Sequence, residues 1–122
     1  MSDLKILITG GLGYLGGRIA DFLKRKHPEL TIILGTSKEI LEVPSWAKSF
    51  QIVRLNVCDK STIDEAVSSD LYAIIHLAAL NEYESFSNIK FAWEVNALGT
   101  LSLLSTANLI LLKDSYSFRA AK

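Results

Sequence analysis

The residues whose types and spacing most directly imply chemistry lie near the N-terminus, in the glycine-rich run TGGLGYLG at residues 9–16. The run follows a short apolar segment and precedes a stretch with helical periodicity. Glycines at such a turn let the backbone approach a pyrophosphate, whose charge is then bound by free N–H groups at the helix N-terminus. We therefore predict a phosphate cradle, with a plain glycine turn as the alternative; its residues are Gly10, Gly13, Tyr14, Leu15 and Gly16.

The segments that must position this cradle alternate between strand and helix patterns. Apolar runs predict strands at 4–9, 30–34, 50–55 and 71–77, and helical periodicity predicts helices at 14–26, about 61–67 and 86–112. Strands joined by helical crossovers pair in parallel. We expect an α/β fold, a Rossmann-type doubly wound parallel sheet in strand order 3-2-1-4, incomplete because a fifth and later strands are missing. Its ligand should lie across the carboxyl ends of the strands, where the order reverses.

The end of the second predicted strand indicates which dinucleotide would be bound. An acidic residue at this position selects NAD by hydrogen bonding to the ribose hydroxyls. This chain instead carries Thr36, Ser37 and Lys38, whose hydroxyls and ammonium suit a 2′-phosphate through charge-assisted hydrogen bonds. We predict that NADP is preferred over NAD; a solvated turn is the alternative, which Glu39 keeps open.

Length and composition limit the partners and the compartment. The 122 residues suffice for one dinucleotide-binding domain, expected at residues 1–107 and followed by a divergent tail at 108–122. A formal net charge of zero argues against nucleic acid or an anionic membrane as partner. No apolar stretch is long enough to span a bilayer. The single cysteine, Cys58, has no partners at metal-ligand spacing and is typical of a reducing compartment. We expect a cytoplasmic protein without a metal site.

Three motifs in order carry a family resemblance. The first is the turn at 9–16, whose glycines Gly10, Gly13 and Gly16 fit the spacing G-x-x-G-x-x-G. The second is HLAA at 76–79, which ends the fourth predicted strand, and the third is VNALGT at 95–100, which lies in the last predicted helix. Together these motifs cover residues 4 to about 107. On them, the chain resembles the extended short-chain dehydrogenase/reductase family, which contains NAD(P)-dependent nucleotide-sugar epimerases and dehydratases.

The resemblance implies cofactor contacts after the fourth predicted strand. Small residues there let the backbone lie against the cofactor, which implies roles for Leu77, Ala78 and Ala79. Asn81 is implied to lie near the nicotinamide ribose. Asn96 is implied to have a structural role beside the site, with an ordinary hydrogen-bonded Asn as the alternative.

Two further residues follow the third predicted strand, where the family places an Asp against the adenine amino group. This chain has Asn56 there, followed by Val57, and the Asn56 side-chain carbonyl can accept the same hydrogen bond. For Asp59, a ligand contact and a cap on the next turn are both open interpretations. Ser61 is the predicted N-cap of the helix that follows.

The family's catalytic pattern, Tyr-x-x-x-Lys, is not matched in this chain. Tyr116 is followed four residues later by Ala120, and the next lysine is Lys122. His76 is expected to be a hydrogen-bonded structural histidine rather than a general base. Residues 82–84 are expected in an exposed acidic loop. We therefore assign no catalytic residue.

The function that follows is the NAD(P)-binding part of a nucleotide-sugar epimerase, dehydratase or reductase-like protein, truncated and not catalytic alone. A nucleotide-sugar substrate is expected only if a full-length protein exists. The alternative is a stand-alone NADP-binding sensor or interaction module; a third outcome is a chain that binds nothing stably. An open edge at the fourth predicted strand also predicts self-association as a homodimer.

Overall fold

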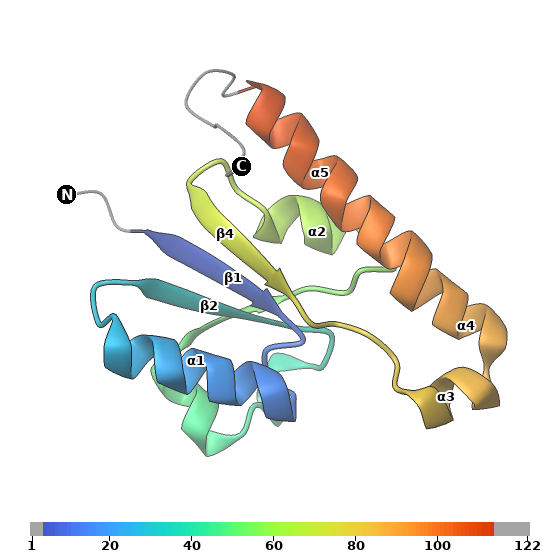
Figure 1. Cartoon of the computed structure of the whole chain (residues 1–122), viewed down its shortest axis with the longest axis horizontal. Coiled ribbons are helices and arrows are strands. Elements are labelled where there is room, and N and C mark those ends of the chain that lie inside the picture. Colours follow the sequence, from blue (N-terminus) through green and yellow to red (C-terminus); the bar gives the residue numbers. More distant parts are fainter. Residues whose placement is uncertain (1–3, 114–122) are drawn as a thin grey trace.

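Four parallel strands form the centre of the computed structural model, which describes residues 4–113 (Figure 1). The divergent tail expected from residue 108 extends beyond this range, and Tyr116 lies outside the described residues. The strands are β1 (Lys5–Thr9), β2 (Thr31–Thr36), β3 (Gln51–Arg54) and β4 (Leu71–His76), in the spatial order β3-β2-β1-β4. Because the first crossovers run outward from β1 and the next returns to its other side, the sheet is the Rossmann-type arrangement that the sequence predicts.

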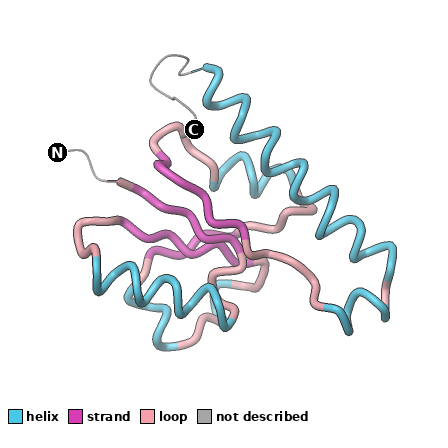
Figure 2. Tube along the Cα trace, viewed as in Figure 1, coloured by secondary structure: helices cyan, strands magenta, loops and turns pink. Residues whose placement is uncertain are grey.

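Helices cover both faces of this sheet (Figures 1 and 2). The helical segments are α1 (Tyr14–Lys26), the short 3₁₀ turns Ile40–Glu42 and Ser45–Ser49, α2 (Lys60–Ala66), α3 (Glu82–Ser87), α4 (Ile89–Trp93), a π-helical stretch Glu94–Gly99, and α5 (Thr100–Lys113). The last three are continuous, so α5 passes without a break across the expected boundary at residue 107. Among residues 4–113, no helix is long and apolar enough to cross a membrane.

The core is divided by the sheet into two apolar layers. Alternate residues of β1 point to opposite faces, so Leu7 packs with α2 and α5 while Ile6 and Ile8 pack with α1. Leu7 and Ile8 are both fully buried. A strand that is apolar at every position is typical of a sheet covered on both sides, which explains why β1 and β2 read as unbroken apolar runs.

The strand register brings three residues from distant parts of the sequence to one edge. Thr9, the last residue of β1, pairs with Gly35 of β2 on one side and with His76 of β4 on the other. Strand β2 continues two residues beyond its expected end, so Thr36 is its buried last residue. The carboxyl ends of all four parallel strands therefore lie along one edge of the sheet, and the strand order reverses between β1 and β4.

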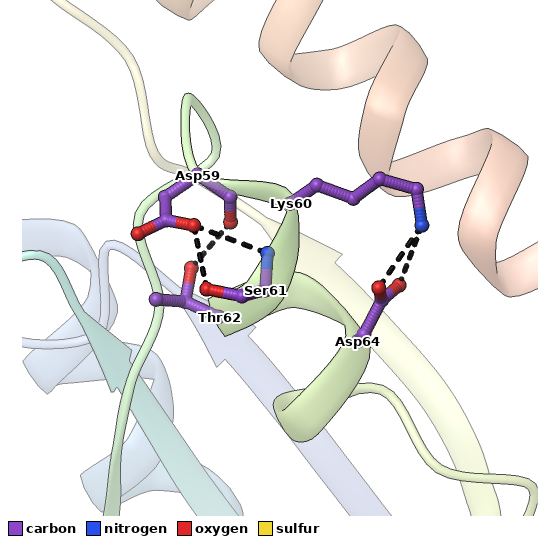
Figure 3. A network of polar contacts seen from close by, with 5 residues as sticks. All are labelled: Asp59, Lys60, Ser61, Thr62 and Asp64. Atoms are coloured by element: carbon purple, nitrogen blue, oxygen red, sulfur yellow. Dashed lines mark hydrogen bonds and ion pairs between the residues drawn. The ribbon is translucent and has the colours of Figure 1, made fainter.

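The N-cap of α2 is Asp59, and the prediction of Ser61 for that position is wrong (Figure 3). An Asp59 carboxylate oxygen accepts hydrogen bonds from the Ser61 backbone N–H at 3.1 Å and from the Ser61 hydroxyl at 2.7 Å. The helix begins at Lys60, so Ser61 supplies one of the N–H groups that need an acceptor. A carboxylate meets that need better than a hydroxyl because it also complements the positive helix end.

The segment at residues 82–84 is helical, and its prediction as an acidic loop is wrong. Asn81 accepts a hydrogen bond from the Glu84 N–H at 2.8 Å, and the Glu84 carboxylate accepts one from the Asn81 N–H at 3.3 Å. This reciprocal pair is a capping box, which starts α3. Asn81 followed three residues later by Glu is the pattern that the loop interpretation overlooked.

We predict that Asp59→Asn makes the stability of the fold less sensitive to acid. The Ser61 hydroxyl hydrogen bond lowers the pKa of Asp59 below its ordinary value of 3.8. A carboxyl group with a lowered pKa stabilises the fold above its unfolded-state value and loses that contribution as the pH falls below it. Urea unfolding above and below pH 3.8 measures this loss.

In that experiment, Ser61→Ala should shift the acid response in the same direction by a smaller amount, because only one of the hydrogen bonds to the carboxylate is removed. Identical acid responses of the wild-type chain and Asp59→Asn would contradict the assigned cap.

Candidate functional site

The glycine turn after β1 lies directly against the segment that follows β4. Gly10 has a φ of 64°, a conformation that favours glycine. A Cβ added at Gly10 would lie 3.0 Å from both the Leu77 carbonyl carbon and the Ala78 nitrogen. The turn and the post-β4 segment can therefore touch only because no side chain stands between them.

The same turn receives the N-terminus of α1. A Cβ at Gly16 would lie 2.6 Å from the Gly10 carbonyl oxygen, so the first turn of α1 packs against the backbone before it. Gly13, the N-cap, provides no side-chain cap, and the first turn carries no acidic residue. The first N–H groups of a helix lack intrahelical acceptors and carry partial positive charge. This helix end is suited to an anion.

A hollow of about 410 Å³ opens at this edge of the sheet, between the turn and the segments that follow β2, β3 and β4. Ten of the predicted site residues line this hollow: Gly10, Gly13, Thr36, Ser37, Lys38, Asn56, Val57, Leu77, Ala78 and Ala79. The structure thus brings four separate parts of the predicted site to one cavity.

The hollow also has walls that sequence reasoning missed. They are the apolar residues Leu12, Leu55, Leu80, Phe91 and Val95. Phe91 and Val95 are four residues apart and therefore lie on one face of the helix that begins at α4; Val95 directly precedes the predicted Asn96. This helical spacing could have indicated a shared apolar face. That the face borders the hollow becomes clear only from the structure, in which the helix returns to the sheet edge.

At the β2 end of the hollow, the charges are arranged around Thr36. The Thr36 hydroxyl accepts a hydrogen bond from the Lys38 N–H at 3.0 Å, which fixes the turn that presents Ser37 and Lys38. The Glu39 carboxylate, which could repel a phosphate there, instead accepts a hydrogen bond from Arg54 Nη1 at 3.2 Å. Lys38 therefore supplies a positive charge to the lining, while Glu39 is engaged elsewhere.

Asn56 lies at the β3 side of the hollow in a local turn. Its side-chain oxygen accepts a hydrogen bond from the Cys58 N–H at 2.9 Å, and its own N–H donates to the Thr62 hydroxyl at 2.9 Å. An amide oxygen has two lone pairs, so one acceptor site on the Asn56 side chain is left for a ligand. Cys58 is exposed, but partial loss of water around its thiol, with a smaller effect of the Glu94 charge, raises the pKa of that thiol.

His76 at the end of β4 is a hydrogen-bonded structural histidine, as the sequence predicts. Its Nδ1 lies 2.6 Å from the Thr9 hydroxyl and its Nε2 lies 2.9 Å from the Thr100 hydroxyl. Burial lowers the pKa of His76 from its ordinary value of 6.5. Both ring nitrogens are therefore engaged in hydrogen bonds within the chain.

Asn96 holds the wall of the hollow in place rather than lining it. Its side-chain oxygen accepts from the Leu80 N–H at 2.8 Å, and its side-chain nitrogen donates to the Leu80 carbonyl at 3.2 Å. The amide thus satisfies both backbone groups of one residue in the post-β4 segment. These two hydrogen bonds fit both the structural role that the family resemblance implies and the alternative of an ordinary hydrogen-bonded Asn.

The remaining predicted site residues lie around the hollow without lining it. Tyr14 is exposed, with the Arg18 guanidinium 5.3 Å from its ring centre, and lines a second hollow of about 980 Å³ along α1. Leu15 is exposed and Gly16 is buried under the turn. The Asn81 side chain is used as the cap of α3. Among residues 4–113, no group of three His, Cys, Asp or Glu side chains is placed to hold a metal ion.

The sequence matches known proteins over most of its length. The NAD dependent epimerase/dehydratase family matches residues 6–117. D-erythronate dehydrogenase of Haemophilus influenzae is 29% identical over 104 residues, which cover 83% of this chain and 32% of that protein. dTDP-D-glucose 4,6-dehydratase of Dictyostelium discoideum is 34% identical over 118 residues, which cover 89% of this chain and 27% of that protein.

Solved structures have the same fold. L-threonine dehydrogenase of Clostridium difficile superimposes with a TM-score of 0.76 at 29% identity, over 90% of this chain and 34% of that protein. UDP-glucose 4-epimerase of Thermus thermophilus, solved in complex with NAD, superimposes with a TM-score of 0.70 at 23% identity, over 88% of this chain and 34% of that one. The chain thus spans about a third of the length of the proteins that it matches.

We predict that Gly16→Ala destabilises the fold by about 1–3 kcal/mol, the usual cost of overpacking. The added methyl would meet backbone atoms of Gly10 and Gly11, which cannot rotate away. This loss should appear in urea unfolding although Ala is the better helix former. Gly13→Ala is the control: its Cβ has one close neighbour, at 3.3 Å, so it should lose only the smaller preference of an N-cap position for Gly over Ala. Equal stabilities of the two variants would contradict the close contact between α1 and the turn.

Proposed function

The chain belongs to the NAD dependent epimerase/dehydratase family, and from that premise we propose that it is the cofactor-binding part of a nucleotide-sugar epimerase, dehydratase or reductase. One observation carries the proposal: the uncapped N-terminus of α1 borders a hollow at the point where the strand order reverses. In open α/β sheets this is where dinucleotides bind.

The residues present suit a dinucleotide in size and chemistry. The glycine turn and the first N–H groups of α1 would hold the pyrophosphate, with Gly10, Gly13 and Gly16 leaving room for close approach. Asn56 has an acceptor for the adenine amino group, beside Val57. The post-β4 segment would support the nicotinamide end, with Ala78 and Ala79 as its small wall residues. A bound dinucleotide would supply hydride transfer.

Tyr14, Leu15, Asn81 and Asn96 remain part of the proposed cofactor site. Leu15 would contribute an N–H group in the first turn of α1, and Tyr14 would cover the pyrophosphate from outside. Asn81 would border the nicotinamide ribose through the backbone that starts α3. Asn96 would act through Leu80, which it holds with two hydrogen bonds.

We propose NADP as the preferred dinucleotide. A 2′-phosphate at the end of β2 would meet Ser37 and the positive charge of Lys38, both of which line the hollow. The Glu39 carboxylate would add little repulsion because Arg54 neutralises it. An NAD preference is the alternative, since this site lacks a buried basic residue that only a phosphate could satisfy.

We propose that this chain binds the dinucleotide without turnover. The sequence contains no Tyr-x-x-x-Lys pattern, so the proton-transfer groups of the family have no counterpart in it. Nucleotide-sugar chemistry would then require a longer polypeptide. A stand-alone NADP-binding sensor or interaction module is the second candidate, favoured by the same observation. Neither proposal expects turnover by this chain alone, so turnover assays with nucleotide sugars distinguish the two only when they are made on a longer polypeptide that contains this chain. A cytoplasmic location is part of both proposals.

We predict that Lys38→Glu weakens NADP binding about tenfold to hundredfold, the loss expected for one hydrogen bond to a charged group. NAD binding should change little, because its ribose lacks the phosphate. Isothermal titration calorimetry with each dinucleotide measures both affinities. Lys48→Glu, which makes the same charge change on an exposed 3₁₀ turn, should leave both affinities unaltered. Tighter binding of NAD than of NADP by the wild-type chain would refute the proposed preference.

We also propose that the chain forms a homodimer through β4. Within the described residues β4 pairs with β1 alone, so one side of the strand has backbone groups free for another chain. Tyr72→Lys should weaken self-association, because a charge on an edge strand disfavours pairing. Tyr83→Lys, on α3, is the matched control. Sedimentation equilibrium checks this, and a wild-type chain that stays monomeric at high concentration would contradict it.

A further inference from the structure

The geometry points to Thr9 as the residue that positions the segment after β4, the wall of the hollow that begins at Leu77 and Ala78. It points to neutral His76 as the group that keeps the Thr9 hydroxyl correctly oriented. Neither residue lines the hollow. Both act on it through the backbone of Leu77 and Ala78. The inference rests on the proposed function only in taking the hollow as the dinucleotide site.

The Thr9 hydroxyl lies among three hydrogen-bonding neighbours. The backbone N–H groups of Leu77 and Ala78 donate to it at 3.0 and 3.1 Å, and the Leu77 N–H also reaches the Thr9 carbonyl at 3.2 Å. A hydroxyl oxygen has two lone pairs and one proton. With both lone pairs used by N–H groups, the proton must go to the third neighbour, His76 Nδ1 at 2.6 Å. Nδ1 is therefore an acceptor without a proton.

The other side of the imidazole ring leads independently to the same assignment. The Thr100 hydroxyl donates its proton to the Asn96 carbonyl at 2.9 Å, one helical turn earlier. Because this proton is used, Thr100 can only accept from His76 Nε2, which lies 2.9 Å away. Nε2 therefore carries the proton, and His76 is the neutral Nε2–H tautomer.

Protonation of His76 would break this arrangement at Nδ1, the ring nitrogen that contacts the buried Thr9 hydroxyl. A proton on Nδ1 removes the acceptor for the Thr9 hydroxyl, so this hydroxyl must turn and compete with the Leu77 and Ala78 N–H groups. Thr9 is fully buried, so a displaced donor has no water to bond to. The wall of the hollow would lose the oxygen that holds it.

The surroundings of His76 give the imidazolium no compensation. Among the described residues, the groups that hydrogen-bond to the ring are the hydroxyl of Thr9 from β1 and the hydroxyl of Thr100 from α5. Both are neutral. Burial is the cause that lowers the pKa of His76, in agreement with the tautomer assigned from geometry.

A shift of this wall would be transmitted to the phosphate cradle. Gly10 lies so close to Leu77 and Ala78 that a Cβ there would meet them at 3.0 Å. The post-β4 backbone and the glycine turn therefore move together. The affinity of the hollow for a dinucleotide should consequently fall when His76 gains a proton.

The network can be tested without any ligand, on the full chain labelled with ¹⁵N. Imidazole ¹⁵N shifts should show the Nε2–H tautomer for His76 at neutral pH, with His27 as the only other histidine signal. The amide signals of Leu77 and Ala78 should shift with the same midpoint as His76, which should lie below pH 6.5. An Nδ1–H tautomer, or amide signals that do not follow His76, would overturn the inference whether or not a dinucleotide binds.

Binding measurements then test the link to the site. NADP affinity of the wild-type chain should fall as the pH drops through the His76 midpoint, by up to about tenfold per pH unit below it. His76→Asn keeps an oxygen near the Nδ1 position but cannot titrate, so its affinity should match the wild type at neutral pH and lack this fall. Because a phosphate monoester itself titrates at about pH 6, the two chains are compared at each pH. Parallel profiles would overturn the inference.

Variants of Thr9 separate the hydroxyl from mere packing. Thr9→Ser keeps the hydroxyl and should retain both the affinity and the pH profile. Thr9→Val keeps the shape and should bind NADP about tenfold to hundredfold more weakly than the wild type at neutral pH, as expected for the loss of two hydrogen bonds. This difference should shrink as the pH falls below the His76 midpoint, because the wild-type chain then loses the same hydrogen bonds. If Thr9→Val does not fold, the pH profiles of Thr9→Ser and His76→Asn still test whether the Thr9–His76 hydrogen bond controls the affinity. No NADP binding by the wild-type chain at any pH would refute the proposed function, while the ¹⁵N experiment would still judge the network.

Discussion

The structure depends on a contact between backbones from which side chains are excluded. At Gly10 the turn after β1 touches the segment after β4, and at Gly16 the helix α1 touches the turn itself. Any Cβ at these places would lie 2.6–3.0 Å from backbone atoms. These contacts set where α1 begins and where its N–H groups lie relative to the sheet edge. They also make the shape of the hollow sensitive to small displacements of either segment.

The polar groups around this contact serve mainly to fix backbone positions. Thr9 binds the N–H groups of Leu77 and Ala78, and Asn96 binds both backbone groups of Leu80. The resulting wall carries few charges of its own. Positive potential at the hollow comes from the end of α1 and from Lys38, so anion binding would rest on backbone geometry more than on side-chain charge.

The fold and much of the site could be predicted from sequence because they depend on local pattern. Apolar runs, glycines and the motif order are enough to give the strand order and most of the lining. Features that depend on tertiary contact were missed or left open. Phe91 and Val95 line the hollow only because their helix returns to the sheet edge. The Asp59 cap of α2, by contrast, is a local contact with Ser61, and the sequence left it open because a ligand contact was an equal alternative. The tautomer of His76 needs Thr9 and Thr100, which are 67 and 24 residues away.

The central claim is that this chain binds a dinucleotide at the carboxyl edge of the sheet. The most direct measurement is an amide-resolved NMR titration of the full ¹⁵N-labelled chain with NADP. The account predicts shifts concentrated in the glycine turn, the first turn of α1, residues 36–38 and the segment after β4. Shifts confined to the second hollow, around Trp46 and Phe50, or no shifts at millimolar NADP, would contradict it.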